Sequence, residues 1–125
     1  MKILLAEDNE LLRKFLTFFL EKNGYEVDQF TNGNDALEAL NEKEYDIILT
    51  DINMPMASGL EITNHVRTQL LRDTPIIVFT SINMEQTELD SFKIGANEFL
   101  TKPISPQVLL VRIEKLLMTA TASII

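Results

Sequence analysis

Apolar and polar residues follow one another in short blocks that predict a strand and then a helix, five times along the chain. Two of the strand blocks, Ile47-Ile48-Leu49 and Ile76-Ile77-Val78-Phe79, are continuously apolar, which is typical of strands covered on both faces of a parallel sheet. The predicted strands are Lys2–Ala6, Glu26–Phe30, Asp46–Thr50, Pro75–Thr80 and Glu98–Thr101.

Helical periodicity follows each predicted strand. In the first helix, apolar residues recur four apart and predict one buried face, made of Leu11, Leu12, Phe15, Leu16, Phe19 and Leu20. The sequence Asn23-Gly24 marks its end. A short second helix surrounds Ala36–Leu40, a third covers Leu60–Leu70, and a fourth around Glu85–Ile94 has few apolar residues. The last begins at Pro106, with Ser105 as its N-cap.

This alternation predicts a doubly wound α/β domain with right-handed crossovers, although it does not choose among strand orders. A chain of 125 residues fits one domain, and its 46% hydrophobic and 24% charged content is that of an ordinary folded domain. We expect the domain to span residues 1–118 and a short C-terminal tail to span residues 119–125.

The composition excludes several classes of function. Eleven basic and 19 acidic residues leave a net charge of −8, which disfavours direct binding of nucleic acid. The absence of cysteine excludes thiolate chemistry, and the single histidine, His65, excludes a two-histidine metal site; we interpret His65 as a surface or satisfied residue. No apolar run approaches the roughly 20 residues of a membrane span, and Glu7-Asp8 comes too early for a signal peptide, so we expect a cytoplasmic protein.

Reactive side chains follow the predicted strands at their carboxyl ends, where open α/β sheets form their sites. They are Glu7-Asp8 after the first strand, Asp51 after the third, Thr80 at the end of the fourth and Lys102-Pro103 after the fifth. If these strands are neighbours, three carboxylates converge, and each pair repels by about 4 kcal/mol at 4 Å and an effective dielectric of 20. Such a cluster needs a cation, and a set of oxygen ligands favours magnesium over zinc.

Each of these residues also has an ordinary structural explanation. Asp8 or Asn9 could cap the first helix, and Asp51 could be a turn residue. Thr80 could be a plain strand residue and Lys102 a solvated lysine. It is their joint placement at four strand ends that indicates a site.

Together these motifs resemble the receiver domains of two-component response regulators, in particular the single-domain type similar to chemotaxis regulators. The resemblance runs from Lys2 to about Leu117 and rests on Glu7-Asp8, Asp51-Ile52-Asn53-Met54-Pro55 with Gly59, Thr80, and Lys102-Pro103. It implies a flavodoxin-like fold, with five parallel strands in the order 2-1-3-4-5 and five helices.

The resemblance also implies a role for each matching residue. Asp51 becomes the phosphoacceptor, Thr80 the switch hydroxyl, Phe99 the aromatic switch residue and Lys102 the ammonium that neutralises a phosphoryl oxygen. The implied cofactor is Mg²⁺, bound by the carboxylates of Asp8 and Asp51 and the backbone carbonyl of Asn53, with Glu7 acting through water. The Lys102-Pro103 bond is implied to be cis.

The implied partners are a sensor histidine kinase or histidine phosphotransfer protein as donor, and a downstream protein or output domain as target. A homodimer through the fourth helix, fifth strand and fifth helix is a further possibility, and a stand-alone receiver and a segment of a longer regulator both remain open. Three positions depart from the usual pattern: Phe99 lacks a tyrosine hydroxyl, Ser81 follows Thr80, and Met56 precedes Ala57.

Three other functions compete. A flavodoxin-type FMN carrier shares the fold, but the acidic loop Glu7-Asp8-Asn9-Glu10 repels a phosphate. An aspartate-nucleophile phosphatase of the haloacid dehalogenase type needs a second aspartate at position 53, where Asn53 cannot transfer a proton, so no substrate turnover is expected. A receiver reduced to a docking scaffold finds no support, because every residue of the implied site is present.

Overall fold

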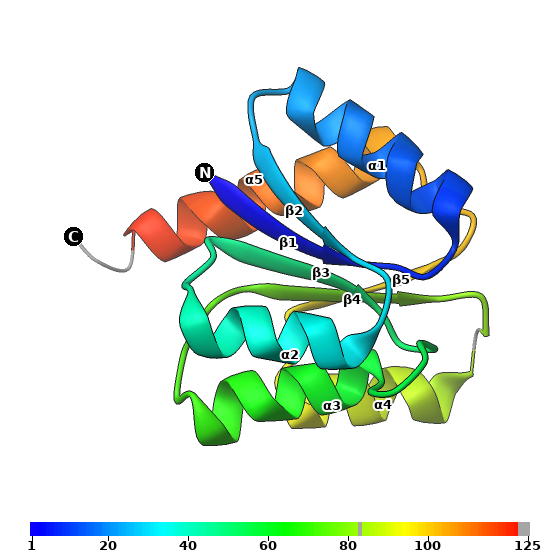
Figure 1. Cartoon of the computed structure of the whole chain (residues 1–125), viewed down its shortest axis with the longest axis vertical. Coiled ribbons are helices and arrows are strands. Elements are labelled where there is room, and N and C mark those ends of the chain that lie inside the picture. The colour runs from blue at the N-terminus through cyan, green and yellow to red at the C-terminus, as the bar shows by residue number, and fades with distance from the viewer. Residues whose placement is uncertain (83, 123–125) are drawn as a thin grey trace.

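Five parallel strands form one sheet with helices on both faces (Figure 1). The computed structural model describes residues 1–82 and 84–122. The strands are β1 (Lys2–Ala6), β2 (Glu26–Phe30), β3 (Ile47–Asp51), β4 (Ile76–Thr80) and β5 (Glu98–Thr101), in the spatial order β2-β1-β3-β4-β5. This order confirms the doubly wound, flavodoxin-like fold, and β3 and β4 each begin one residue later than predicted.

The helices divide between the two faces of the sheet. Helices α1 (Glu10–Lys22) and α5 (Pro106–Ala122) cover one face, and α2 (Gly33–Glu42), α3 (Gly59–Asn64) and α4 (Glu85–Ile94) cover the other (Figure 1). The predicted third helix is in fact two pieces, because a π-helical turn, η1 (His65–Gln69), continues α3. None of the helices in the described part of the chain has both the length and the apolar character of a membrane span.

Helix α5 continues to Ala122, four residues beyond the domain boundary that we expected at residue 118. Residues 123–125, the end of the expected tail, lie outside the described residues. The helix starts as predicted, since Pro106 is its first residue and the backbone N–H of Val108 donates to Ser105 Oγ at 3.3 Å.

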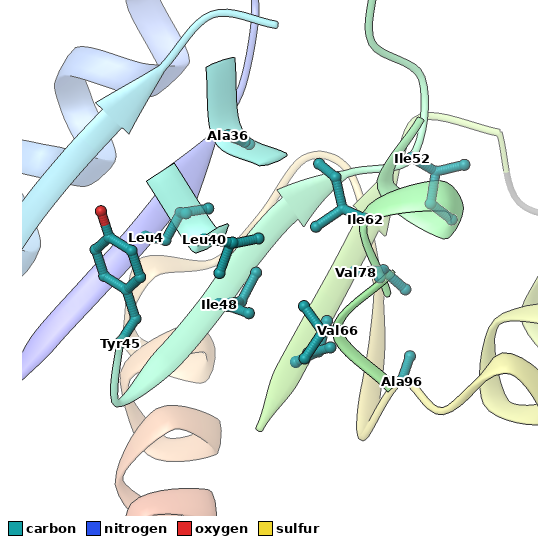
Figure 2. Close-up of a cluster of buried hydrophobic side chains, with 12 residues drawn as sticks. Leu4, Ala36, Leu40, Tyr45, Ile48, Ile52, Ile62, Val66, Val78 and Ala96 are labelled. Carbon is teal, nitrogen blue, oxygen red and sulfur yellow. The ribbon is translucent and has the colours of Figure 1, made fainter. Parts of the chain in front are cut away.

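The core consists of one apolar cluster on each face of the sheet, and β3 and β4 are buried along their whole length, as their continuous apolar runs predicted. Successive strand residues point to opposite faces. Ile48 and Val78 therefore pack toward α2 and α3, with Ile62 (Figure 2), whereas Leu49 and Phe79 belong to the cluster under α1 and α5.

The prediction of one buried face on α1 is partly wrong. Leu16 and Leu20 are fully buried, but Leu11 is 84% exposed and Phe15 is 49% exposed. A helix lying on a sheet buries only the stripe that faces the strands, and spacing by four residues does not distinguish that stripe from its neighbour. Leu11, Phe15 and Phe18 form the neighbouring stripe, which faces solvent.

The weak apolar pattern of α4 is confirmed as weak packing. Ser91 is the only residue of this helix that is fully covered, and the N-cap residue, Met84, provides no capping side chain. The opposite end is held firmly: the Arg67 guanidinium donates to the carbonyl oxygens of Gly95 (3.1 Å) and Arg72 (2.9 Å) and to Asn97 Oδ1 (3.0 Å). Helix α4 is therefore fixed at its C-terminus and loosely held at its N-terminus, which follows β4.

One buried hydroxyl in α1 is unpartnered in the structure, which generates a stability prediction. Thr17 is buried and its Oγ1 has no hydrogen-bond partner, so Thr17→Val should remove a desolvated polar group without changing the shape of the side chain. The free energy of unfolding should rise by about 1 kcal/mol, measured by urea denaturation.

Thr63→Val is the matched control, because the Thr63 hydroxyl is also buried but donates to Gly59 O at 2.8 Å. This variant should lose about 1 kcal/mol, since it gives up a hydrogen bond. Destabilisation by both substitutions would contradict the assignment of Thr17 as unpartnered.

Candidate functional site

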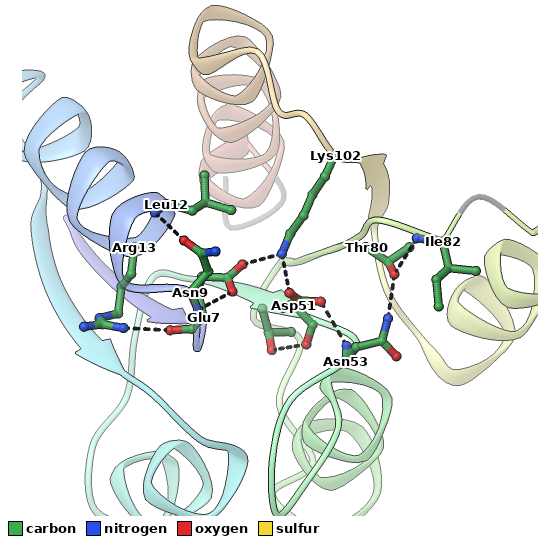
Figure 3. A network of polar contacts seen from close by, with 10 residues as sticks. Glu7, Asn9, Leu12, Arg13, Asp51, Asn53, Thr80, Ile82 and Lys102 are labelled. Atoms are coloured by element: carbon green, nitrogen blue, oxygen red, sulfur yellow. Dashed lines mark hydrogen bonds and ion pairs between the residues drawn. The ribbon is translucent and has the colours of Figure 1, made fainter.

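The register of the parallel strands brings the predicted reactive residues to one edge of the sheet. Ala6 of β1 pairs with Thr50 of β3, so the residues that follow them, Glu7 and Asp51, are neighbours. Thr80 pairs with Thr101, and the backbone N–H of Lys102 donates to Thr80 O at 2.8 Å. Adjacent parallel strands end together, and four short segments far apart in sequence therefore meet at one place (Figure 3).

Lys102 joins two of the carboxylates. Its Nζ lies 2.5 Å from Asp51 Oδ2 and 2.8 Å from Glu7 Oε1, and the lysine side chain is largely covered (Figure 3). Burial by itself lowers the pKa of Lys102, but the hydrogen bonds to Asp51 and Glu7, together with the negative charges of these carboxylates, raise that pKa above its usual value. The lysine is therefore a fixed positive charge and not a solvated surface residue.

Glu7 is fully buried, so its charged carboxylate is destabilised by the loss of hydration. Burial raises its pKa from 4.5 to about 7, against the opposing effects of the Lys102 ammonium and of the Asn9 N–H, which donates to Glu7 Oε2 at 2.9 Å. Repulsion from the nearby Asp51 carboxylate contributes to this rise. Near neutral pH this carboxyl group is close to the point where it takes up a proton.

Asp8 completes an acidic cluster. One carboxylate oxygen from each of Glu7, Asp8 and Asp51 lies within 4.8 Å of the others. Asp8 does not cap α1, because Asn9 Oδ1 accepts the backbone N–H of Leu12 at 3.0 Å and fills that role. Asp8 is exposed, while Asp51 is almost fully buried.

Three carboxylates with one ammonium leave an excess of negative charge. The donor set is entirely oxygen, and such a set fits a hard divalent cation that retains several water ligands. The residues present therefore fit a metal site of the kind that the sequence predicted.

Asp51 is held rigidly by the loop that follows it. The backbone N–H of Asn53 donates to Asp51 Oδ1 at 2.9 Å, and the N–H of Gly59 donates to Ile52 O at 3.0 Å. The start of α3 passes so close to this loop that a Cβ on Gly59 would lie 2.4 Å from Asp51 O, so only glycine fits there.

Thr80 is completely buried at the end of β4, and its hydroxyl has two donors. Asn53 Nδ2 donates to Thr80 Oγ1 at 2.9 Å, and the backbone N–H of Ile82 donates to the same oxygen at 3.1 Å (Figure 3). Sequence reasoning assigned only the backbone carbonyl of Asn53 to the site and missed this side-chain contact. No pattern in the sequence signals it, because its two partners lie 27 residues apart.

The remaining predicted residues lie beside this centre. The Lys102–Pro103 bond is cis, and Phe99 is half-buried on β5, where it pairs with Val78 and packs against the cluster under α2 and α3. His65 is not part of the centre: its Nε2 lies 2.8 Å from Asn41 Oδ1, which confirms the satisfied histidine of our interpretation.

Comparison with known proteins gives the same family at three levels. The response regulator receiver domain model matches residues 3–114. The chain is 33% identical over 120 residues to the transcriptional regulatory protein ResD of Bacillus subtilis, and the match covers 96% of this chain and 49% of ResD. It is 31% identical over 116 residues to the transcriptional regulatory protein SrrA of Staphylococcus aureus, covering 93% of this chain and 47% of SrrA. The chain therefore spans about half the length of these curated relatives.

Solved structures of receiver domains have the same fold as this chain. The receiver domain of Francisella response regulator 1452 superposes with a TM-score of 0.90 at 28% identity, covering 95% of this chain and 98% of that domain. The chemotaxis protein CheY4 of Vibrio cholerae superposes with a TM-score of 0.84 at 30% identity, covering 91% of this chain and 96% of CheY4. With the acidic cluster, the hydroxyl and the lysine assembled on this fold, the chain belongs to the response regulator receiver domain family.

Proposed function

We propose that Asp51 accepts a phosphoryl group from a phosphohistidine donor protein, with Mg²⁺ as cofactor, and that the domain then changes conformation to signal to a partner. The observation that carries this proposal is the position of Asp51. Its carboxylate accepts hydrogen bonds from Lys102 and from the Asn53 N–H, and it lies beside two other carboxylates. The side chain of Asn53 also donates to the buried Thr80 hydroxyl and so connects that hydroxyl to Asp51.

Phosphoryl transfer needs positioning and charge neutralisation more than a strong nucleophile. The Asp51 carboxylate forms a bond to phosphorus as the bond from phosphorus to the histidine nitrogen of the donor breaks, and the imidazole leaves with the electron pair. Lys102, already 2.5 Å from Asp51 Oδ2, neutralises part of the charge on the incoming phosphoryl oxygens.

The proposed metal ligands are the carboxylates of Asp8 and Asp51 and the backbone carbonyl of Asn53, with Glu7 acting through water. When bound, Mg²⁺ would supply the positive charge that Lys102 alone does not provide. The supporting observation is the cluster of three carboxylates within 4.8 Å.

Signalling would use the loosely held end of α4. Thr80 donates its hydroxyl proton to a phosphoryl oxygen and moves toward Asp51, and Phe99 on the adjoining strand fills the space that this movement opens. Because Thr80 Oγ1 also accepts the N–H of Ile82, movement of Thr80 pulls on the segment that leads into α4. The missing hydroxyl of Phe99 means that packing alone stabilises its inward position.

We also propose the setting in which this domain acts. The donor is a sensor histidine kinase or a histidine phosphotransfer protein, and the receiver of the signal is a downstream protein, an output domain or a second copy bound through the face of α4, β5 and α5. The proposed location is the cytoplasm, and the proposal includes no direct contact with nucleic acid. The domain assists its own phosphorylation and dephosphorylation but turns over no other substrate. We propose residues 1–118 as the functional unit.

The aspartate-nucleophile phosphatase remains the nearest alternative because it uses the same residue types. It requires a proton-transferring side chain two residues after the nucleophile. Asn53 has no titratable group, and its side-chain amide donates a hydrogen bond to Thr80 Oγ1. This observation favours the receiver.

The first test concerns the acceptor. Incubation with Mg²⁺ and acetyl phosphate should add one phosphoryl group per chain, detected as a mass increase that survives acid and is removed by base. Asp51→Asn should abolish the adduct, because an amide is a far poorer nucleophile than a carboxylate. Asp73→Asn, an exposed aspartate outside the cluster, should label like the wild type. Full labelling of Asp51→Asn would overturn the assignment.

The second test concerns the metal and pH. With a dissociation constant of about 1 mM, 10 mM Mg²⁺ should raise the free energy of unfolding by about 1.4 kcal/mol, and Asp8→Ala should remove this gain. Without metal, the raised pKa of Glu7 means that the folded state keeps a proton which the unfolded chain loses. The free energy of unfolding should therefore fall as the pH rises from 4.5 through 7.

The gain from Mg²⁺ should accordingly be larger at pH 8 than at pH 6, since Glu7 must lose its proton for the cluster to carry its full negative charge. Glu7→Gln should flatten both pH dependences. Urea denaturation with EDTA or Mg²⁺ at several pH values measures these effects. A metal response identical in wild type and Asp8→Ala would show that the cluster is not the cation site.

The third test concerns the switch. Beryllofluoride, a phosphoryl mimic, with Mg²⁺ should change amide hydrogen exchange across residues 81–95 and around Phe99, because α4 is weakly packed and begins five residues after Thr80. Helix α2 (Gly33–Glu42), on the same face of the sheet, serves as the internal control and should not change. Changes restricted to the loops at Asp51 and Lys102 would contradict the proposed switch.

A further inference from the structure

Asn53 links the proposed phosphoacceptor to the proposed switch residue. Its backbone N–H donates to Asp51 Oδ1 at 2.9 Å, and its side-chain Nδ2 donates to Thr80 Oγ1 at 2.9 Å. Within residues 1–82 and 84–122, it alone forms hydrogen bonds with the side chains of both. Figure 3 shows the resulting path from Asp51 through Asn53 and Thr80 to Ile82.

The hydrogen bonds that Thr80 Oγ1 accepts leave its hydroxyl proton available for donation. A threonine hydroxyl has two acceptor positions and one proton to donate. Asn53 Nδ2 and the Ile82 N–H occupy the acceptor positions, at 2.9 and 3.1 Å. No described residue accepts the proton, although Thr80 is completely buried. The hydroxyl can therefore donate a hydrogen bond to an acceptor that enters the site.

We infer that the side-chain amide of Asn53 is a positioning group, which orients the Thr80 hydroxyl so that its proton is available to the phosphoryl group on Asp51. This inference rests on the proposed function of Asp51 and Thr80. It concerns the side chain of Asn53 and is separate from the proposed metal role of its backbone carbonyl.

The physical reason is preorganisation. Without the amide, one acceptor position of Thr80 is empty and the hydroxyl is free to choose among its staggered rotamers. Fixing a rotamer before the phosphoryl group arrives removes that entropic cost from the binding step. The same two donors tie Thr80 to the loop after Asp51 and to the segment before α4, so the oriented hydroxyl also transmits movement between them.

The test measures binding of beryllofluoride to the Mg²⁺-loaded chain by ¹⁹F NMR in a double-mutant cycle of Asn53→Ala and Thr80→Val. Asn53→Ala should weaken binding about 3- to 10-fold, as expected for loss of one neutral hydrogen bond. In the Thr80→Val background the same substitution should change binding less than about 2-fold, because the group through which Asn53 acts is already gone.

Each other outcome overturns the inference. Equal weakening in both backgrounds would mean that Asn53 acts directly on the phosphoryl group or through general structure, and no weakening in the wild-type background would mean that the amide has no part in binding. If the wild-type chain itself fails to bind beryllofluoride, the proposed function fails, which distinguishes the two failures.

A second measurement decides the matter if Thr80→Val prevents binding altogether. In the metal-free chain, the Asn53 side-chain amide should have a proton resonance and exchange rate typical of a bonded group, measured by ¹H–¹⁵N NMR. Both should be lost in Thr80→Val and retained in Thr80→Ser, which keeps the hydroxyl. Identical spectra for this amide in all three proteins would show that the hydrogen bond does not form, and would overturn the inference.

Discussion

The position of one ammonium group between two buried carboxylates governs the rest of this site. Lys102 lies within hydrogen-bonding distance of Glu7 and Asp51, and the strands that carry the three residues are fixed in register by the sheet. The carboxylates cannot move apart to relieve their repulsion, since movement would break β1, β3 or β5 away from the core. One positive charge does not balance three negative ones. The fold therefore creates a local demand for positive charge at the carboxyl edge of the sheet.

The three carboxylates differ because the fold surrounds them differently. Glu7 is fully buried and its pKa is raised to about 7, Asp51 is almost fully buried against Lys102, and Asp8 is exposed. Residues of the same chemistry thus differ in their burial and in their access to a ligand. Asp51, with both oxygens held, is the one whose direction is determined by the protein itself.

The elements of the fold differ in how tightly they are packed. The central strands β3 and β4 are buried over their whole length, so the site lies at the end of a closely packed core. Helix α4 contributes only Ser91 to the fully buried residues, and the Arg67 guanidinium holds its C-terminal end. This weakly packed helix, held at its C-terminal end, is the element that we propose responds to a change at Asp51.

Much of this protein could be predicted from its sequence by itself. Continuous apolar runs predicted β3 and β4 because only strands buried on both faces tolerate them, and the alternation with helices then required a parallel sheet. The positions of Glu7, Asp51, Thr80 and Lys102 at strand ends predicted a shared site, since parallel strands end at one edge. Local patterns determine such features.

The tertiary structure alone decided the rest. Which apolar stripe of α1 is buried depends on how the helix lies on the sheet, so Leu11 and Phe15 were misassigned. The burial that raises the pKa of Glu7 depends on the elements packed over β1, and the hydrogen bond from Asn53 to Thr80 depends on the loop after β3 meeting the end of β4. Burial and long-range contacts belong to the assembled chain, because each needs atoms that only folding brings within reach.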